Sequence, residues 1–382
     1  MSERDMSEKG MNEKGMHERG ISEKGMHERG ISEKDMIEKG MHERGISEKG
    51  ICIAVEEAVE GIPAVRLENA WLRAVILVGK GTDIWELTYK PLNADVLLKT
   101  AAGLAPLRGR DLRQSPLLHY AEPYPGGWQE LLPNRARYGA EDIGRDREGE
   151  SAGLPWRFEI RREERAVVLR CRVTLSRTPL AIEKTFRLTA EAPDLHLEER
   201  VVNVGREPVS FIWAHHPAFG GPLVDASARV VLPAGSTAFN LLRYEQDRTL
   251  PLSRYEEDPR AVTLPSGRSK DLHRVEARSS GGEGCYVPLK GFEIGEAGID
   301  NPELGLSLRL RWDAETFGCL RYWSRSDDEL HTVALEPSSS WFSDLDDCLR
   351  HGNSITLQPE ERRETWLRIR LDRFGSSPPP EA

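Results

Sequence analysis

The stretch Ala166-Val-Val-Leu-Arg-Cys-Arg-Val-Thr-Leu175 alternates apolar with charged or polar side chains over much of its length. Successive side chains of a β-strand point to opposite faces, so this alternation is typical of a strand with one buried and one solvated face. The segment Leu180-Ala-Ile-Glu-Lys-Thr-Phe-Arg-Leu188 repeats the pattern. Charged positions at every second residue predict antiparallel sheets with one face in water.

The same pattern extends along most of the chain. Further strand-like segments cover residues 74–78, 196–203, 209–213, 306–312, 332–336 and 365–371. Long amphipathic helices are scarce, and 34 glycines and 24 prolines separate the short strands. This pattern favours an all-β fold, a large antiparallel β-sandwich, over an α/β fold.

The chain divides into three parts by composition. Residues 1–50 are ten tandem pentapeptides of Met or Ile, a polar residue, Glu, Lys or Arg, and usually Gly. A period of five matches neither a helix nor one face of a strand, so we expect a disordered extension. We predict a single β-sandwich domain over 51–372, with a charged, Gly- and Ser-rich surface excursion at 253–283. The Pro-rich tail 373–382 should be disordered.

Bulk composition restricts the class of protein. The net charge of −10 argues against a nucleic-acid partner. No run of 18 apolar residues predicts a membrane span, and no apolar signal region is seen at the N-terminus, so we expect a soluble, cytoplasmic protein. The five cysteines are scattered without metal-ligand spacing, which predicts reduced and mostly buried thiols.

Two segments carry candidate chemistry. Trp213-Ala-His-His-Pro-Ala-Phe-Gly220 holds a histidine pair after a strand-like run, and Glu336 stands in the later segment 332–336. Adjacent strand residues face opposite ways, so His215 and His216 are poor joint metal ligands. We expect the following proline to end the strand ladder. A histidine and a glutamate can move protons by general acid–base catalysis, without metal or cofactor. The plain alternatives are a core-edge histidine and a surface carboxylate.

Four motifs occur in the order found in one family: Gly126-Gly-Trp-Gln-Glu-Leu-Leu-Pro-Asn134, Gly149-Glu-Ser-Ala-Gly-Leu-Pro-Trp156, His216-Pro-Ala-Phe219 and Ala334-Leu-Glu-Pro337. Each motif is short, but together they resemble the aldose 1-epimerases, also called galactose mutarotases, over roughly residues 60–370. The resemblance implies the mutarotase-like supersandwich, with a sugar cleft across one sheet. It also implies interconversion of the α and β anomers of a sugar.

The resemblance assigns roles to particular residues. It implies that His216 is the acid and Glu336 the base, with no cofactor and a small-molecule sugar as the partner. Sugar sites combine flat apolar faces with polar groups. Tryptophans 128, 156, 213 and 323 are candidates for the flat faces, with Trp128 preferred. The expected polar contacts come from Gln129, Asn134, Glu148, Glu150 and His215.

One departure keeps alternatives open. The family usually has His-Gly where this chain has Glu148-Gly149, which puts the usual hexose specificity, and activity itself, in question. A non-catalytic carbohydrate-binding protein is therefore one alternative. Another is an epimerase or lyase for a phosphorylated or acidic sugar, for which arginines 135, 137, 145 and 147 would supply positive charge.

Overall fold

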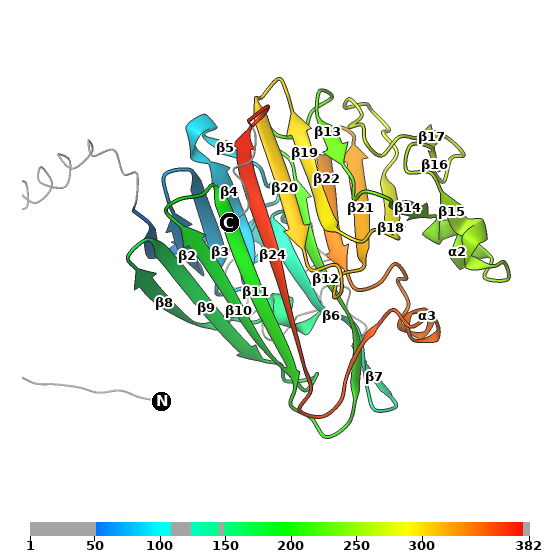
Figure 1. The fold of residues 1–382 in the computed structure, drawn as a ribbon, viewed down its shortest axis with the longest axis horizontal. Coiled ribbons are helices and arrows are strands. Elements are labelled where there is room, and N and C mark those ends of the chain that lie inside the picture. The colour runs from blue at the N-terminus through cyan, green and yellow to red at the C-terminus, as the bar shows by residue number, and fades with distance from the viewer. Residues whose placement is uncertain (1–50, 108–123, 145–148, 377–382) are drawn as a thin grey trace, which may run out of the picture. The chain divides into compact units, whose positions relative to one another are not determined.

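A computed structural model of the protein describes residues 51–107, 124–144 and 149–376. Most of them belong to two antiparallel sheets that lie face to face (Figure 1), and the predicted large antiparallel β-sandwich is thereby confirmed. The expected extension 1–50, Glu148 and residues 377–382 of the expected tail lie outside the described residues. The final strand continues one residue beyond 372, to Arg373.

The larger sheet has 14 strands. In spatial order its main path is β1 (Ile53–Val59), β2 (Ile62–Glu68), β3 (Leu72–Leu77), β4 (Asp83–Tyr89), β6 (Trp128–Tyr138), β12 (Val209–Phe219), β22 (His331–Ser338), β21 (Cys319–Ser326), β18 (Cys285–Lys290), β14 (Thr237–Phe239) and β15 (Glu256–Glu257). Three short strands lie beside this path: β5 (Ala94–Asp95), β7 (Glu141–Gly144) and β23 (Ile355–Leu357).

The smaller sheet has eight strands and forms the front layer in Figure 1. Its order is β13 (Arg229–Val231), β19 (Gly295–Asn301), β20 (Leu306–Trp312), β24 (Arg362–Arg373), β11 (Asp194–Asn203), β10 (Leu180–Thr189), β9 (Ala166–Thr174) and β8 (Arg157–Glu163). The described helical elements are short: η1 (Lys90–Leu92), η2 (Ala105–Leu107), η4 (Glu150–Gly153), α2 (Leu241–Gln246), η5 (Leu252–Tyr255) and α3 (Leu345–Arg350). None of these helices has the length and apolar character needed to cross a membrane.

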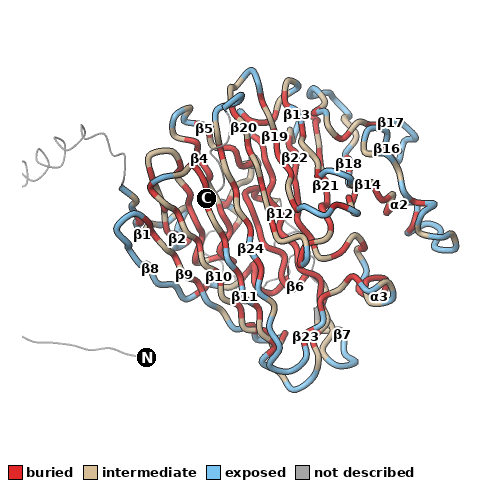
Figure 2. Tube along the Cα trace, in the orientation of Figure 1, coloured by how far each residue is buried: buried red, intermediate tan, exposed pale blue. Residues whose placement is uncertain are grey.

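The predicted alternation explains the layering. Along β10 and β20 every second side chain is buried, and these buried side chains face the larger sheet across a shared core. Figure 2 shows the resulting alternation of buried and less buried positions along the front strands. The strand-like segments at 166–175, 180–188, 196–203, 306–312 and 365–371 correspond to β9, β10, β11, β20 and β24, so these predictions are confirmed.

The expectation that Pro217 ends its strand is wrong. Strand β12 continues through Pro217 to Phe219, with Pro217 in register with Trp128 of β6. The amide of the next residue, Ala218, donates to the carbonyl of Gly127 at 3.1 Å, so pairing resumes at once. A proline inside a sheet loses one ladder bond. Here the strand tolerates that loss because it is paired on both sides and fully buried.

The predicted surface excursion at 253–283 is only partly irregular. It contains β15 and a separate two-stranded ribbon of β16 (Val262–Thr263) and β17 (Ser269–Lys270). Several of its residues are buried, including Tyr255, Val262 and Leu272. Apolar positions spaced among charged ones allow this segment to pack against the sheet, and it forms one wall of the cleft described next.

Candidate active site

Three adjacent strands of the larger sheet bring the predicted acid and base together. Strand β12 pairs with β22 at Ala214–Ser338 and Ala218–Ala334, which sets His216 opposite Glu336. On the two flanking strands, Gln129 of β6 is in register with His216, and Arg321 of β21 is in register with Glu336. Residues directly opposite each other on antiparallel strands share a face of the sheet. We call Gln129, His216, Glu336 and Arg321 the cross-strand row.

The two central side chains of the row are in contact. Nε2 of His216 lies 3.3 Å from Oε1 of Glu336, and both side chains are largely buried. The other ring nitrogen of His216, Nδ1, lies 3.1 Å from the hydroxyl of Tyr124. When the hydroxyl oxygen accepts from Nδ1–H, Nε2 is the nitrogen that can give up or take a proton, on the side of Glu336.

Two small residues and a tryptophan pack together beside the row. The next row consists of Ala218 on β12, Ala334 on β22 and Trp323 on β21. The ring of Trp323 lies 5.8 Å from that of His216 and 6.2 Å from that of Tyr124, measured between centroids. The two alanines are fully buried in a cluster with Leu98, whereas Tyr124 and Trp323 line the cleft with the aromatic rings that the face of a sugar requires.

The rings of Tyr124 and Trp323 line a cleft with a volume of about 690 Å³. Its base includes His216, Glu336 and Arg321, and its walls include Tyr124, Asn134 and residues of the 240–265 segment. Burial raises the pKa of the Glu336 carboxyl above its ordinary value, while the nearby His216 and Arg321 act in the opposite direction. A buried carboxylate beside an imidazole, open to a cleft, is suited to proton transfer.

His215 faces the other way, as its position one residue before His216 predicts. It is buried between the sheets, where its Nδ1 accepts from the indole of Trp128 at 3.2 Å and its Nε2 donates to Glu199 at 2.9 Å. The ammonium of Lys184 lies 2.8 Å from Glu130 and 3.0 Å from Glu199. We call Glu130, Lys184, Glu199 and His215 the inter-sheet cluster.

The inter-sheet cluster has its own charge balance. Burial opposes ionisation of Glu199, but the neighbouring His215 and Lys184 lower its pKa to about 2. Burial raises the pKa of Glu130. Oxygen and nitrogen atoms of Glu130, Glu199 and His215 lie close enough together to hold a metal ion. The ammonium of Lys184 already supplies the positive charge at that place, so we assign no metal there.

The structure separates the predicted sugar-binding residues. Asn134 lines the cleft, and Gln129 belongs to the cross-strand row, where its Oε1 is buried without a hydrogen-bond partner among the described residues. Trp128 and His215 lie in the core between the sheets and do not line the cleft. Trp323, one of the other tryptophans considered, does line it.

Glu150 has a different task from the one expected. Its carboxylate is buried and accepts hydrogen bonds from the amides of Ser176, Arg177 and Thr178 and from the Ser176 hydroxyl, at 2.6–2.9 Å. It therefore fixes the turn between β9 and β10 and does not line the cleft, so we withdraw it from the sugar site. Of the four arginines considered for an acidic sugar, Arg135 lines the cleft, Arg137 pairs with Asp142 and Asp346, and the other two lie outside the described residues.

Two side chains of the cleft were not predicted. Tyr124 lies two residues before the Gly126 motif and carries no sequence signal of its own. The position of Arg321 in the cleft results from its pairing with Glu336, 15 residues later, across the β21–β22 hairpin. The turn of that hairpin is not evident in the sequence. A correct pairing of 319–326 with 331–338 would have revealed it.

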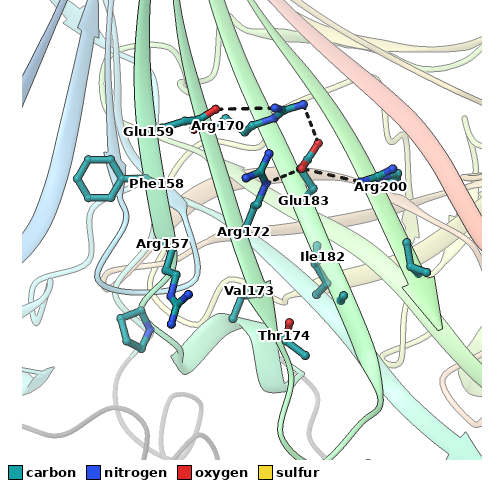
Figure 3. Close-up of a pocket in the computed structure, with 13 residues that line it drawn as sticks. Arg157, Phe158, Glu159, Arg170, Arg172, Val173, Thr174, Ile182, Glu183 and Arg200 are labelled. Carbon is teal, nitrogen blue, oxygen red and sulfur yellow. Dashed lines mark hydrogen bonds and ion pairs between the residues drawn. The ribbon is translucent and has the colours of Figure 1, made fainter. Parts of the chain in front are cut away.

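A second hollow lies on the solvent-facing side of the smaller sheet, over β8 to β11 (Figure 3). Its volume is about 740 Å³, and its charged side chains pair across strands, as Figure 3 shows for Glu183 with Arg170, Arg172 and Arg200. Such pairs are typical of the wet face of a sheet. Its lining includes no histidine, whereas His216 and Glu336 line the cleft of the larger sheet.

Comparison with solved structures identifies the fold. A galactose mutarotase-like protein from Clostridium acetobutylicum matches with a TM-score of 0.63 at 14% identity, over 85% of this chain and 99% of that one. Galactose 1-epimerase from Lactobacillus acidophilus matches with a TM-score of 0.55 at 12% identity, over 85% and 99% of the two chains. The protein has the galactose mutarotase-like fold.

This likeness concerns the fold alone. A TPR-domain containing protein from Parabacteroides distasonis also matches, with a TM-score of 0.54 at 14% identity, over 84% of this chain and 49% of that one. No family model matches the sequence, and no curated protein is similar to it. Function must therefore be argued from the site.

Proposed function

We propose that the protein is an aldose 1-epimerase-like isomerase that interconverts the α and β anomers of a sugar. The observation that carries this proposal is the contact of His216 with Glu336, 3.3 Å apart in a cleft that the aromatic rings of Tyr124 and Trp323 also line. The mutarotase-like fold of the chain supports the same reaction class.

The reaction requires one proton to leave an oxygen and another to reach its neighbour. Glu336 removes the proton from the hydroxyl on the anomeric carbon, and His216 in its imidazolium form donates the Nε2 proton to the ring oxygen and becomes the neutral imidazole. The bond between the anomeric carbon and the ring oxygen breaks, and a carbonyl forms at the anomeric carbon. Rotation about the adjacent carbon–carbon bond and closure from the other face yield the second anomer, with the two groups exchanging roles.

The geometry suits these roles. Both oxygens are bonded to one carbon atom, so an acid and a base in mutual contact are able to reach the pair together. Burial makes Glu336 a stronger proton acceptor than an exposed glutamate. The contact with Tyr124 at Nδ1 orients His216 so that Nε2 faces Glu336. The proposed proton transfers need no cofactor.

Anomer exchange measured by NMR tests this proposal. Wild type, His216→Ala and Glu336→Gln are compared on a panel of neutral aldoses, uronic acids and sugar phosphates. We expect exchange above the spontaneous rate for at least one sugar, lowered by about 100-fold or more in both variants, because each removes one half of the proton transfer. His196→Ala and Glu198→Gln, on the outer face of β11, serve as matched controls and should retain the wild-type rate.

The alternative is a carbohydrate-binding protein without catalysis. In that case the wild type binds a sugar, Glu336→Gln retains nearly the same affinity, and no sugar shows accelerated exchange. This combination would contradict the proposed isomerase. A sugar phosphate or uronic acid as the sole substrate would keep the reaction and redirect the substrate class toward the acidic sugars.

A further inference from the structure

Arg321 occupies the end of the cross-strand row, directly opposite Glu336. Side chains opposite each other on antiparallel strands have Cβ atoms about 4.5–5.5 Å apart on the same face of the sheet. Arg321 and Glu336 accordingly line the same cleft. The row therefore places an acid, a base and a fixed cation on three neighbouring strands.

The guanidinium of Arg321 is buried and held by the backbone. Only 5% of the residue is exposed. Its Nε donates to the carbonyl of Ser340 and its Nη2 to that of Phe342, each at 3.2 Å. Among the described residues no carboxylate lies within 4 Å of it, and its Nη1 makes no hydrogen bond. A buried cation without a close ion pair is costly, which indicates a purpose beyond packing.

The charge that Arg321 faces is that of Glu336. The titratable groups around this carboxyl are His216 from β12 and Arg321 and Cys319 from β21. The charge of His216 changes when it gives up its proton, and burial raises the pKa of the Cys319 thiol, which keeps it neutral. Arginine remains cationic in proteins. Arg321 is thus the lasting positive charge beside the base.

We propose that Arg321 is a positioning residue of the acid–base site, whose fixed charge keeps the buried Glu336 in its carboxylate form while two backbone carbonyls hold that charge in place. This inference rests on the proposed function for its kinetic consequence. It also has a consequence that needs no activity, because the ionisation of Glu336 is a property of the protein itself.

The test compares wild type, Arg321→Gln and Arg321→Lys. In the first measurement, the pH dependence of kcat for anomer exchange gives the acid limb set by Glu336. In the second, the carboxyl carbon of Glu336 is titrated by NMR in protein labelled with carbon-13 glutamate, and the signal is assigned by its loss in Glu336→Gln. Arg172→Gln, which removes an exposed arginine from the outer face of β9, is the control for loss of a distant charge.

We expect Arg321→Gln to move both midpoints upward by about 1–3 pH units, the usual effect of an adjacent arginine on a carboxyl. Arg321→Lys should restore most of that shift, and Arg172→Gln should leave the midpoints unchanged. At high pH, where Glu336 is ionised in every variant, the rates should converge. Arg321→Met, which leaves no polar group to satisfy, replaces Arg321→Gln if the latter does not fold.

Two other outcomes are distinguishable. A folded charge-removing variant with an unchanged NMR midpoint overturns the inference, as does a rate lowered equally at every pH without rescue by lysine, which is the behaviour of a purely structural residue. If wild type shows no exchange with any sugar, the proposed function fails, and the NMR titration alone decides the role of Arg321.

Discussion

The hydroxyl of Tyr124 determines how His216 presents its ring to the cleft. It contacts Nδ1 at 3.1 Å, and the two rings meet edge to face with centroids 5.4 Å apart. An acceptor at Nδ1 keeps a proton there in both charge states of the ring, so Nε2, the atom beside Glu336, is the nitrogen that exchanges its proton. The proposed acid therefore depends on a residue outside the strand that carries it.

Tyr124→Phe isolates this contact, because it removes the hydroxyl and retains the ring. We expect kcat for anomer exchange to fall by about 3- to 30-fold with little change in KM, since a hydrogen bond of this kind contributes roughly 1 kcal/mol. Steady-state kinetics on the best sugar of the panel measure both constants. An unchanged kcat in a folded variant would show that the orientation of His216 is set elsewhere.

Residue-level patterns singled out His216 and Glu336, which the structure brings into contact, but misplaced several neighbours. The adjacency of His215 and His216 correctly predicted that they face opposite sides of the sheet, because strand periodicity is local. Trp128 and Glu150 were expected in the cleft, yet one packs between the sheets and the other fixes a turn. Nothing near Glu150 in the sequence reveals the amides of residues 176–178 that bind it. Such partners depend on which strands become neighbours.

At the scale of elements, β12 separates two kinds of polar chemistry. Its cleft side carries His216, and its core side carries His215 of the inter-sheet cluster. That cluster ties β12 and β6 to β10 and β11 of the smaller sheet, through bonds of 2.8–3.0 Å. Lys184 shares the buried face of β10 with Ile182 and Phe186. A charge on that face is stable only when it is paired.

Lys184→Met tests how much this link stabilises the fold. The substitution leaves Glu130 and Glu199 buried without their cation, so we expect a loss of roughly 3–5 kcal/mol in the free energy of unfolding at neutral pH. The loss should shrink as the pH falls, because protonated carboxyls no longer carry buried charge. Denaturant unfolding at several pH values provides the measurement.

Lys99→Met is the matched control for the loss of a lysine from a surface pair with Asp95, whose side chains are about one-third exposed. Exposed ion pairs contribute roughly 0–1 kcal/mol, so the stability of this variant should stay close to that of the wild type. Equal stabilities for Lys184→Met and Lys99→Met would mean that the inter-sheet cluster does not stabilise the sandwich.

At the scale of the whole molecule, the sequence predicts which segments form strands but not the order of those strands in the two sheets. Alternating segments such as 180–188 and 306–312 identify strands with one buried face, and the structure confirms them. Their arrangement in two sheets depends on contacts between segments far apart in the chain, as in the pairing of β11 with β24. Pro217 and Pro337 lie inside β12 and β22, although proline is rare within paired strands. Pairing with the neighbouring strands maintains both strands.

The five cysteines are placed so that they report on this whole-molecule packing. Cys171, Cys285, Cys319 and Cys348 are buried free thiols, in β9, β18, β21 and α3, and Cys52 is partly exposed. Burial raises their pKa values to about 11 or 12, so each is a neutral and poorly reactive thiol at pH 8. The sequence-based expectation of reduced, mostly buried cysteines is confirmed in its burial.

Labelling with a thiol reagent at pH 8 should therefore modify Cys52 alone in the native protein, and slowly. In denaturant all five should react. At intermediate denaturant, Cys171 and Cys285 should share one rate, because their strands bury one common core and open together. Cys348 belongs to a separate cluster with Phe342 and Leu345, so its labelling should begin at lower denaturant.

Mass spectrometry of the labelled peptides resolves each site, and Cys52→Ser removes the native phase as a control. Native labelling of Cys319 as fast as that of Cys52 would contradict the full burial of Cys319 on β21.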